Sequence, residues 1–271
     1  MTGPIFDTHA HYSSRAFDAD RIALLDSLPD KGVVGVCEQA THSGDAPRVL
    51  ELAHRYPWVV AAIGIHPESL LPAADCGEEG PAPTVSVYGG DWAAEMQALM
   101  PYYDDPKVVA VGECGLDYHW PVPKDAQLAL FEAEIRLALE LDKPIIVHDR
   151  QAHADVYALL KKYRPKGIVH CYSGSAEDAV QLAAQGLYIG FGGACTFNGA
   201  KRAAKAIEAL PLDAIVLETD CPYMAPEPVR GTRCDSSLIR YVGAYIAQRK
   251  ALAPEEVFRT TAANARRVFG L

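Results

Sequence analysis

The stretch PIIVHDRQAHADVYALLKKYRPKGIVHC, residues 144–171, contains the repeating unit that decides the fold of this chain. An apolar run at 144–148 is followed by a segment of helical periodicity at 154–163 and by a second apolar run at 167–171. Neither run alternates apolar and polar residues, which is typical of strands covered on both faces. The order strand, helix, strand predicts two parallel strands joined by a crossover helix.

The same alternation extends in both directions from this stretch. Eight apolar, β-branched runs predict strands at residues 5–9, 33–37, 59–66, 108–113, 144–148, 167–171, 187–191 and 214–220. Helical periodicity occurs at residues 127–142, 154–163, 176–185, 200–210, 236–249 and 254–269. Eight strand–helix units favour an α/β fold of the closed TIM-type (β/α)8 barrel. An open, doubly wound sheet is the alternative, and its dinucleotide-binding version is disfavoured because no GxGxxG motif follows the first strand.

Length and composition fit a single domain over residues 1–271. The chain has 271 residues, 49% of them hydrophobic, and single barrels commonly reach this size. One Pro- and Gly-rich stretch at 72–91 breaks the rhythm and predicts an extended loop within the domain. It fits a tolerated surface loop, and it also fits a wall of the substrate site, because it leaves the C-terminal end of a strand.

Net charge and cysteine content restrict the classes of protein and the cellular locations that fit this sequence. The net charge of −10 argues against a protein that coats nucleic acid, which would need many Lys and Arg side chains to neutralise phosphates. It leaves room for a nucleic-acid enzyme whose site holds cations. Seven Cys without a CxxC or a compact disulfide spacing fit a reducing, cytoplasmic location. Residues 1–7 lack a basic region followed by an apolar stretch, so we expect no signal peptide, and no apolar run approaches the length of about 18 residues that suggests a membrane span.

Metal-binding side chains lie where the predicted strands end. They are His9 and His11 (first strand), Glu113 (fourth), His148 (fifth), His170 (sixth) and Asp220 (eighth). In a barrel these strand ends gather on one face. Imidazole and carboxylate together suit Zn²⁺ and Mn²⁺, and carboxylates add tolerance for Mg²⁺. Each residue alone has a plainer interpretation, a rim hydrogen bond for a His or a helix cap for an acid, but the set as a whole predicts a divalent-cation site.

The chain resembles the TatD-type deoxyribonucleases, a branch of the amidohydrolase superfamily. The matching segments are FDTHAHY (6–12), GIHPES (64–69), VGECGLDYHW (111–120), PIIVHDR (144–150), HCYSGS (170–175), GFGGACTF (190–197), LETDCPYMAP (217–226), RGTR (230–233) and TAANARRVFGL (261–271). The resemblance covers almost the whole chain. The sequence departs from the family's pattern in the long stretch 72–91 and in CDSS at 234–237, where the family more often has Asn-Glu-Pro.

This resemblance implies a metal-dependent phosphodiesterase acting on DNA, with 3′–5′ exonuclease activity as one form of it. It implies two divalent metal ions per chain, drawn from Mg²⁺, Mn²⁺ or Zn²⁺. His9, His11, Glu113 and Asp220 would hold one ion, and Glu113, His148 and His170 the other. Two such ions activate water for attack on a phosphodiester, and Asp220 is the candidate general base, with Glu113 as the shared catalytic carboxylate.

Two other functions stay open at this stage. The same site could hydrolyse an ester or amide that is not a nucleic acid. A non-catalytic metal or nucleic-acid binding module is the third hypothesis, and the acidic balance and the lack of a basic stripe with interleaved aromatics count against it.

Five further residues are candidates for contact with the substrate: His66, Tyr118, Arg150, Ser173 and Arg230. Each also has a structural interpretation, such as a rim hydrogen bond for His66 or an ion pair with a nearby acid for Arg150. We expect DNA as the substrate, no membrane association, no obligate protein partner, and a monomer rather than an oligomer.

Overall fold

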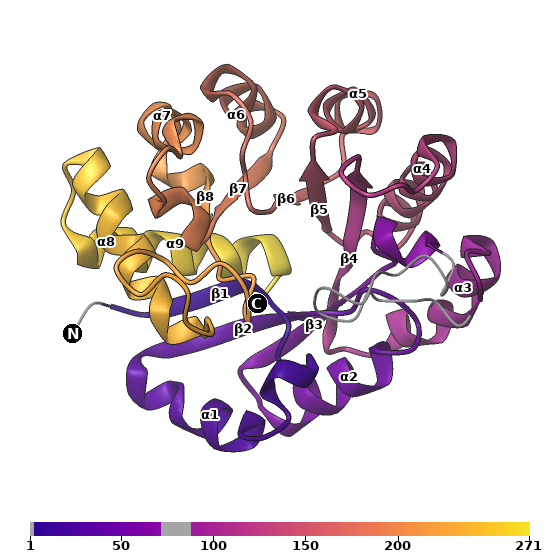
Figure 1. The fold of residues 1–271 in the computed structure, drawn as a ribbon, viewed down its shortest axis with the longest axis horizontal. Helices are drawn as coiled ribbons and strands as arrows, with labels where there is room; N and C mark the ends of the chain where they lie inside the picture. Colours follow the sequence, from indigo (N-terminus) through magenta and orange to yellow (C-terminus); the bar gives the residue numbers. More distant parts are fainter. Residues whose placement is uncertain (1–2, 72–87) are drawn as a thin grey trace. The chain divides into compact units, whose positions relative to one another are not determined.

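The computed structural model describes residues 3–71 and 88–271. Its eight strands form one sheet in the order β1 to β8 (Figure 1). They are β1 (Ile5–Ala10), β2 (Val33–Gln39), β3 (Val59–Ile63), β4 (Val108–Asp117), β5 (Ile145–Arg150), β6 (Gly167–Val169), β7 (Leu187–Phe191) and β8 (Ile215–Leu217). The pairings of β1 with β2, β3 with β4, β4 with β5 and β7 with β8 are parallel. A parallel bridge between Ala10 and Cys221 joins the first strand to the segment after the last, so the predicted (β/α)8 barrel is confirmed.

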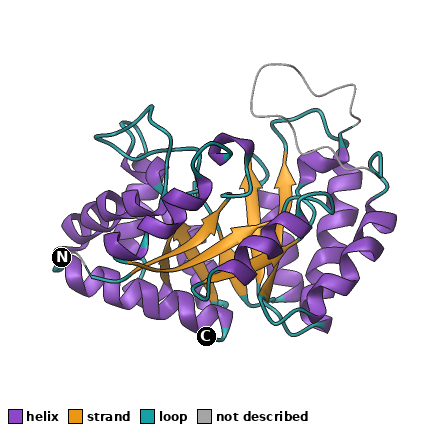
Figure 2. Cartoon of the chain, turned by 90° about the horizontal axis from the view of Figure 1, so that it is seen from below, coloured by secondary structure: helices purple, strands orange, loops and turns teal. Residues whose placement is uncertain are grey.

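Helices alternate with these strands along the chain. Figure 2 shows the helices in purple and the strands in orange. The helices are α1 (Arg21–Ser27), α2 (Ala46–Arg55), α3 (Trp92–Leu99), α4 (Lys124–Glu140), α5 (His153–Tyr163), α6 (Ala176–Ala184), α7 (Lys201–Ala209), α8 (Ile239–Lys250) and α9 (Pro254–Phe269). The last six are the helices predicted from periodicity, with ends that differ by a few residues, whereas α1, α2 and α3 were not predicted. In the part of the chain that the structure describes, no helix is both long and apolar enough to cross a membrane.

The chain divides into two compact units, residues 1–38 with 168–271 (the first unit) and residues 39–167 (the second unit). A single domain over 1–271 therefore stays a prediction. The expected loop at 72–91 lies outside the described residues except for its end. There, residues 88–90 form a turn and Asp91 caps α3 by accepting a hydrogen bond from the Ala94 N–H at 3.1 Å.

In the first unit, α9 packs against β1 and β8. Its apolar face brings Phe269 to Phe6 of β1, with ring centroids 5.9 Å apart. Burying side chains of this size contributes about 1.5–3 kcal/mol each. The buried amide of Asn264 donates hydrogen bonds to the carbonyls of Leu212 and Ile215, at 3.0 and 2.8 Å, and thereby fixes the start of β8.

In the second unit, β4 and β5 pair further than the sequence predicted. The pairing continues from Cys114 with Val147 to Asp117 with Arg150. Gly115 makes this close approach possible, because its φ is +140° and a Cβ at this position would collide with the carbonyl oxygen of His148. The extra length adds Asp117 to the strand face that carries Glu113, and both carboxylates lie beside His148.

Three strands end earlier than predicted. β3 stops at Ile63, so His66 does not end a strand but caps the 3-10 turn at Pro67–Leu70. β6 stops at Val169 and β8 at Leu217, so His170 and Asp220 lie in the loops that follow. All three remain at the C-terminal side of their strands, where the barrel fold places functional residues.

Candidate metal centre

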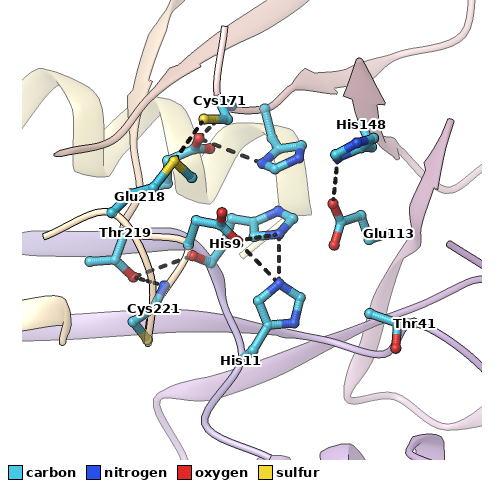
Figure 3. Close-up of polar contacts among 12 residues, drawn as sticks. His9, His11, Thr41, Glu113, His148, Cys171, Glu218, Thr219 and Cys221 are labelled. Carbon is cyan, nitrogen blue, oxygen red and sulfur yellow. Dashed lines mark hydrogen bonds and ion pairs between the residues drawn. The ribbon is translucent and has the colours of Figure 1, made fainter. Parts of the chain in front are cut away.

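In the first unit, β1 directs two imidazoles to one point. His9 and His11 are two residues apart on a strand and therefore face the same side. Their Nε2 atoms are 3.1 Å apart (Figure 3). Asp220 Oδ1 lies 3.6 Å from His9 Nε2 and 3.3 Å from His11 Nε2. Two metal–nitrogen bonds laid end to end span about 4 Å, so both imidazoles can reach the same ion. Two nitrogens and one carboxylate oxygen at this spacing fit a divalent cation.

Asp220 is held in place by its own backbone. Its N–H donates to the carbonyl of His9 at 2.9 Å, which ties the loop after β8 to β1. Its φ of +58° lies in the left-handed region, which Asp tolerates better than most residues. Burial disfavours the charged carboxylate, but the hydrogen bond from His11 and the nearby imidazoles of His9 and His170 outweigh it, and the pKa of Asp220 is lowered. The group is therefore an anion suited to a cation.

His170 belongs to the same unit and stacks on His9. The two rings are nearly parallel, at 8°, with centroids 3.9 Å apart. On its other side, His170 Nδ1 lies 3.7 Å from Oε1 of the fully buried Glu218. The same Glu218 oxygen accepts a hydrogen bond from the N–H of Cys171 (Figure 3). Glu218 thus connects the segment after β8 to the loop that carries His170.

A second buried acid, Asp7, supports the imidazole pair from within β1. It accepts hydrogen bonds from the His9 N–H at 3.2 Å, from the N–H and hydroxyl of Thr219 at 3.0 and 2.7 Å, and from the hydroxyl of Ser236 at 2.7 Å. Burial raises the pKa of Asp7 to about 7. Ser236 lies in the CDSS segment, where the sequence departs from the family's pattern. Through its hydrogen bond to Asp7, this segment contacts the acid that also holds the backbone of His9.

Glu38, at the end of β2, supports the other imidazole. Its carboxylate accepts hydrogen bonds from the N–H groups of Tyr12 and Ser13, at 2.9 and 2.6 Å, immediately after His11. Burial raises the pKa of Glu38 to about 7. Glu38 therefore shapes the turn by which the chain leaves His11.

In the second unit, a carboxylate and two imidazoles again come together. Glu113 Oε1 lies 3.1 Å from His148 Nδ1 and 3.6 Å from His66 Nε2 (Figure 3 shows the first pair). His66 was predicted only as a substrate contact. Its Nδ1 accepts a hydrogen bond from the Glu68 N–H at 3.2 Å, so in a neutral ring the proton is on Nε2, the atom that faces Glu113. In this tautomer His66 is a donor and not a metal ligand.

His148 is oriented by Asp117, which sequence analysis did not select. Asp117 Oδ2 lies 3.0 Å from His148 Nε2, and the carboxylate is fully buried. Burial opposes its ionisation, but the hydrogen bond with His148 prevails and the pKa of Asp117 is lowered. An Nε2–H donated to Asp117 leaves the lone pair on Nδ1, directed toward Glu113. A carboxylate behind a metal-binding histidine commonly fixes the tautomer in this way.

Comparison with known proteins identifies the relatives of this chain. The model of the family described as TatD related DNase matches residues 6–270. The chain belongs to this family. The resemblance inferred from the sequence motifs is therefore confirmed over almost the full length.

Individual members of the TatD-related family cover the chain almost completely. The uncharacterized metal-dependent hydrolase YabD of Bacillus subtilis (strain 168) is 37% identical over 269 residues, 98% of each chain. The 3′-5′ ssDNA/RNA exonuclease TatD of Erwinia tasmaniensis is 29% identical over 279 residues, 98% of this chain and 100% of its own. The crystal structure of YjjV, a TatD homologue from Escherichia coli K12, matches with a TM-score of 0.87 and 28% identity over 100% of both chains.

Two predicted contact residues of this TatD-related chain lie at the surface of the second unit. Arg150 has an exposed guanidinium, with Nη1 3.9 Å from Asp117 Oδ2 and Cζ 6.0 Å from the centre of the Trp120 ring. Tyr118 donates its hydroxyl to Asp155 at 2.7 Å, and burial together with that carboxylate raises the pKa of Tyr118. Arg150 is thus available beside Asp117, whereas the hydroxyl of Tyr118 is already engaged.

The other two predicted contacts are in the first unit and are not joined to its candidate ligands. Ser173 is exposed and lines a cavity. Arg230 is exposed, with Cζ 4.1 Å from the centre of the Phe197 ring and Nη1 3.9 Å from Glu227. Among residues 3–71 and 88–271, no hydrogen bond or ion pair connects Ser173 or Arg230 to His9, His11 or Asp220.

Four buried acids that contact the candidate ligands or the backbone beside them were missed from sequence: Asp7, Glu38, Asp117 and Glu218. For Asp117 a signal was present, because it lies four residues after Glu113 on the same face of one strand. Asp7 likewise precedes His9 by two residues. No local signal identifies Glu38 or Glu218, since their partners are backbone N–H groups distant in sequence.

Proposed function

We propose that this chain is a metal-dependent phosphodiesterase that hydrolyses DNA, as a 3′–5′ exonuclease. The observation that carries the proposal is the convergence of His9 Nε2, His11 Nε2 and Asp220 Oδ1 on one point in a chain of the TatD-related family. The exonuclease activity in the name of the Erwinia relative supports the substrate class. The three donors provide the cation site that hydrolysis of an anionic phosphodiester requires.

The residues that would hold metal form two groups. His9, His11, Asp220 and Glu113 would hold one divalent ion, and Glu113, His148 and His170 a second. Mg²⁺, Mn²⁺ and Zn²⁺ all suit such mixed ligands. When bound, the ions lower the pKa of water and stabilise charge on the phosphate oxygens.

The protein's own side chains perform the remaining tasks. Asp220, with two oxygens, accepts a proton from the attacking water with one of them. Asp117 holds His148 with Nδ1 available, and Asp7 and Glu38 hold the backbone on either side of the imidazole pair in β1. These contacts fix the ligands before a substrate arrives, which avoids reorganisation during the reaction.

Substrate contacts are assigned to side chains around the two groups of candidate ligands. His66 carries its proton on Nε2, 3.6 Å from Glu113 Oε1, and is assigned to a phosphate oxygen. Arg150, exposed and cationic, would pair with a further phosphate of the strand. Tyr118 and Arg230 are assigned to more distant parts of the strand, because their side chains are engaged elsewhere, and Ser173 is assigned to the part of the strand near His170, where it lines a cavity.

The test is digestion of a 5′-end-labelled single-stranded oligonucleotide by protein treated with EDTA and then supplied with Mg²⁺, Mn²⁺ or Zn²⁺. We expect no cleavage without metal and a ladder of products shortened from the 3′ end with it. His11→Ala should abolish the ladder, and His54→Ala, whose ring is exposed and pairs with Asp105, should not. The proposal would be overturned if the protein hydrolysed small esters or amides but cleaved neither DNA nor RNA with any of the three ions.

A further inference from the structure

The first unit contains a cavity of about 460 Å³ that starts one residue from His170. Its walls come from the loop after β6, the loop after β7 and the beginning of α7, elements that Figure 1 labels. Cys171 and Ser173 line it on one side. Cavities of about 300–1,000 Å³ are typical of small-molecule sites in proteins. This volume is therefore sufficient for a ligand rather than a few waters.

The lining of the cavity includes two adjacent cationic side chains. Lys201 and Arg202 line the cavity and are exposed. Within the part of the chain that the structure describes, neither side chain forms a hydrogen bond or an ion pair. In a protein of net charge −10, two adjacent uncompensated cations at the mouth of a cavity favour an anionic ligand. They lie in the first turn of α7, where the helix dipole adds to the attraction.

Much of the remaining lining is apolar. Tyr172 and Phe191 are buried and meet edge to face, with centroids 6.2 Å apart. Ala194 and Cys195 extend this surface, and burial raises the pKa of the Cys195 thiol to about 12, so that this side chain stays neutral. A ligand that matches the whole cavity has a flat apolar part and a negatively charged part. Nucleotides combine these two features.

We propose that this cavity binds one nucleotide of a nucleic-acid strand, with the base against the wall of Tyr172, Phe191 and Ala194 and a phosphate at Lys201 and Arg202. The proposal rests on the proposed function and adds a subsite to it. A strand seated here passes beside His170, so the cavity holds a nucleotide near the phosphodiester to be cleaved. Base contact with apolar walls is tolerant of sequence, which suits an exonuclease.

The binding test uses EDTA-treated protein and isothermal titration calorimetry, with thymidine 3′,5′-bisphosphate as the probe and thymidine and inorganic phosphate as comparisons. The variant Lys201→Ala with Arg202→Ala should bind the bisphosphate about tenfold more weakly, the loss expected for hydrogen bonds to a charged group. The matched control is Lys205→Ala with Arg259→Ala. It removes the same charge from exposed residues that do not line the cavity, and its Kd should stay within about twofold of wild type.

A second pair of measurements addresses the base and the strand. Ala194→Leu fills the apolar part and should weaken the bisphosphate while leaving inorganic phosphate unchanged. For binding of single-stranded dT5, the plot of log binding constant against log salt concentration should become shallower by about 0.7 for each of the two cations removed. Thermal unfolding of every variant verifies that it is folded.

Four results would overturn the subsite: no binding of the bisphosphate by wild type, equal loss in the control pair, no effect of Ala194→Leu, or binding of the bisphosphate without binding of dT5. The last result would assign the cavity to free nucleotides. Because these measurements need neither metal nor hydrolysis, they are independent of the cleavage assay. A protein that digests oligonucleotides but gives any of these results retains the proposed function and loses only the subsite.

Discussion

His148 and Asp117 form a pair in which the carboxylate lies behind the imidazole, with Asp117 Oδ2 3.0 Å from His148 Nε2. The opposite ring nitrogen, Nδ1, lies 3.1 Å from Glu113 Oε1. One ring nitrogen therefore donates to a buried acid, and the other presents its lone pair on the side of Glu113. The tautomer of His148, and with it the nitrogen that could bind an ion, is set by Asp117.

Asp117→Asn should weaken binding of Mn²⁺ or Zn²⁺ by about 10–100-fold, the usual cost of losing such a supporting group. The amide cannot stabilise the Nε2–H tautomer as a carboxylate does. Calorimetric titration of the apoprotein measures the effect without any assay of hydrolysis. Asp125→Asn, at an exposed position of α4, is the control and should bind as wild type does. Equal affinities in the two variants would remove Asp117 from the site.

Asp220→Asn should reduce kcat for oligonucleotide cleavage by about 10²–10⁴-fold or more, the range that general-base catalysis contributes. Asn keeps the shape and one oxygen, but it cannot accept a proton at neutral pH and contributes no negative charge to an ion. The melting temperature should change little. Asp213→Asn, an exposed acid before β8, provides the comparison. Turnover within a few-fold of wild type at saturating Mg²⁺ or Mn²⁺ would exclude Asp220 as ligand and as base.

Much of the fold could be predicted because buried parallel strands have a strong local signal. β7 has the predicted bounds, since Leu187–Phe191 is a continuous apolar run. Strand ends were less predictable because they depend on a partner. β4 reaches Asp117 only because β5 continues beside it to Arg150, and β3 stops early because the ring of His66 caps the next turn. α2 was missed although Val49, Leu52 and Ala53 form a buried helical face.

The candidate ligands were predictable because strand periodicity and strand ends are visible in sequence. His9 and His11 meet as their spacing requires, and Asp220 joins them. Their supports were not predictable. Glu38 accepts from Tyr12 and Ser13, and Glu218 from Cys171, and each partner comes from another element of the barrel. Nothing in the local sequence around a buried acid states which distant N–H group it will meet.

Glu134 makes stability depend on pH. It is buried on α4, and Oε1 accepts the N–H of Ile65 at 2.8 Å. Burial, and secondarily the nearby Glu95, raise its pKa well above the usual value. The folded state then binds a proton that the unfolded state releases, so stability falls as pH rises above the ordinary pKa of Glu. Glu134→Gln should lack this slope.

Urea unfolding at pH 5 and pH 8 measures the difference. The free energy of unfolding of Glu134→Gln minus that of wild type should be larger at pH 8 than at pH 5, because only wild type loses stability as the pH rises. Glu140→Gln, at an exposed position of the same helix, should show no such change. A difference that is equal at the two pH values would mean that Glu134 is ionised in the folded protein.

Metal binding should stabilise the protein through the two imidazoles of β1. A ligand that binds only the folded state adds RT ln(1 + [L]/Kd), about 2.7 kcal/mol at a hundred times Kd. Addition of Mn²⁺ to EDTA-treated protein should therefore raise the melting temperature in a concentration-dependent way. His9→Ala with His11→Ala should lower or abolish this increase, because the two Nε2 atoms lie 3.1 Å apart and can reach the same ion. The single variant His54→Ala keeps both imidazoles and should respond as wild type does.

An undiminished response in the double variant would mean that Mn²⁺ stabilises the fold from another site, and the assignment of His9 and His11 as ligands would have to be withdrawn.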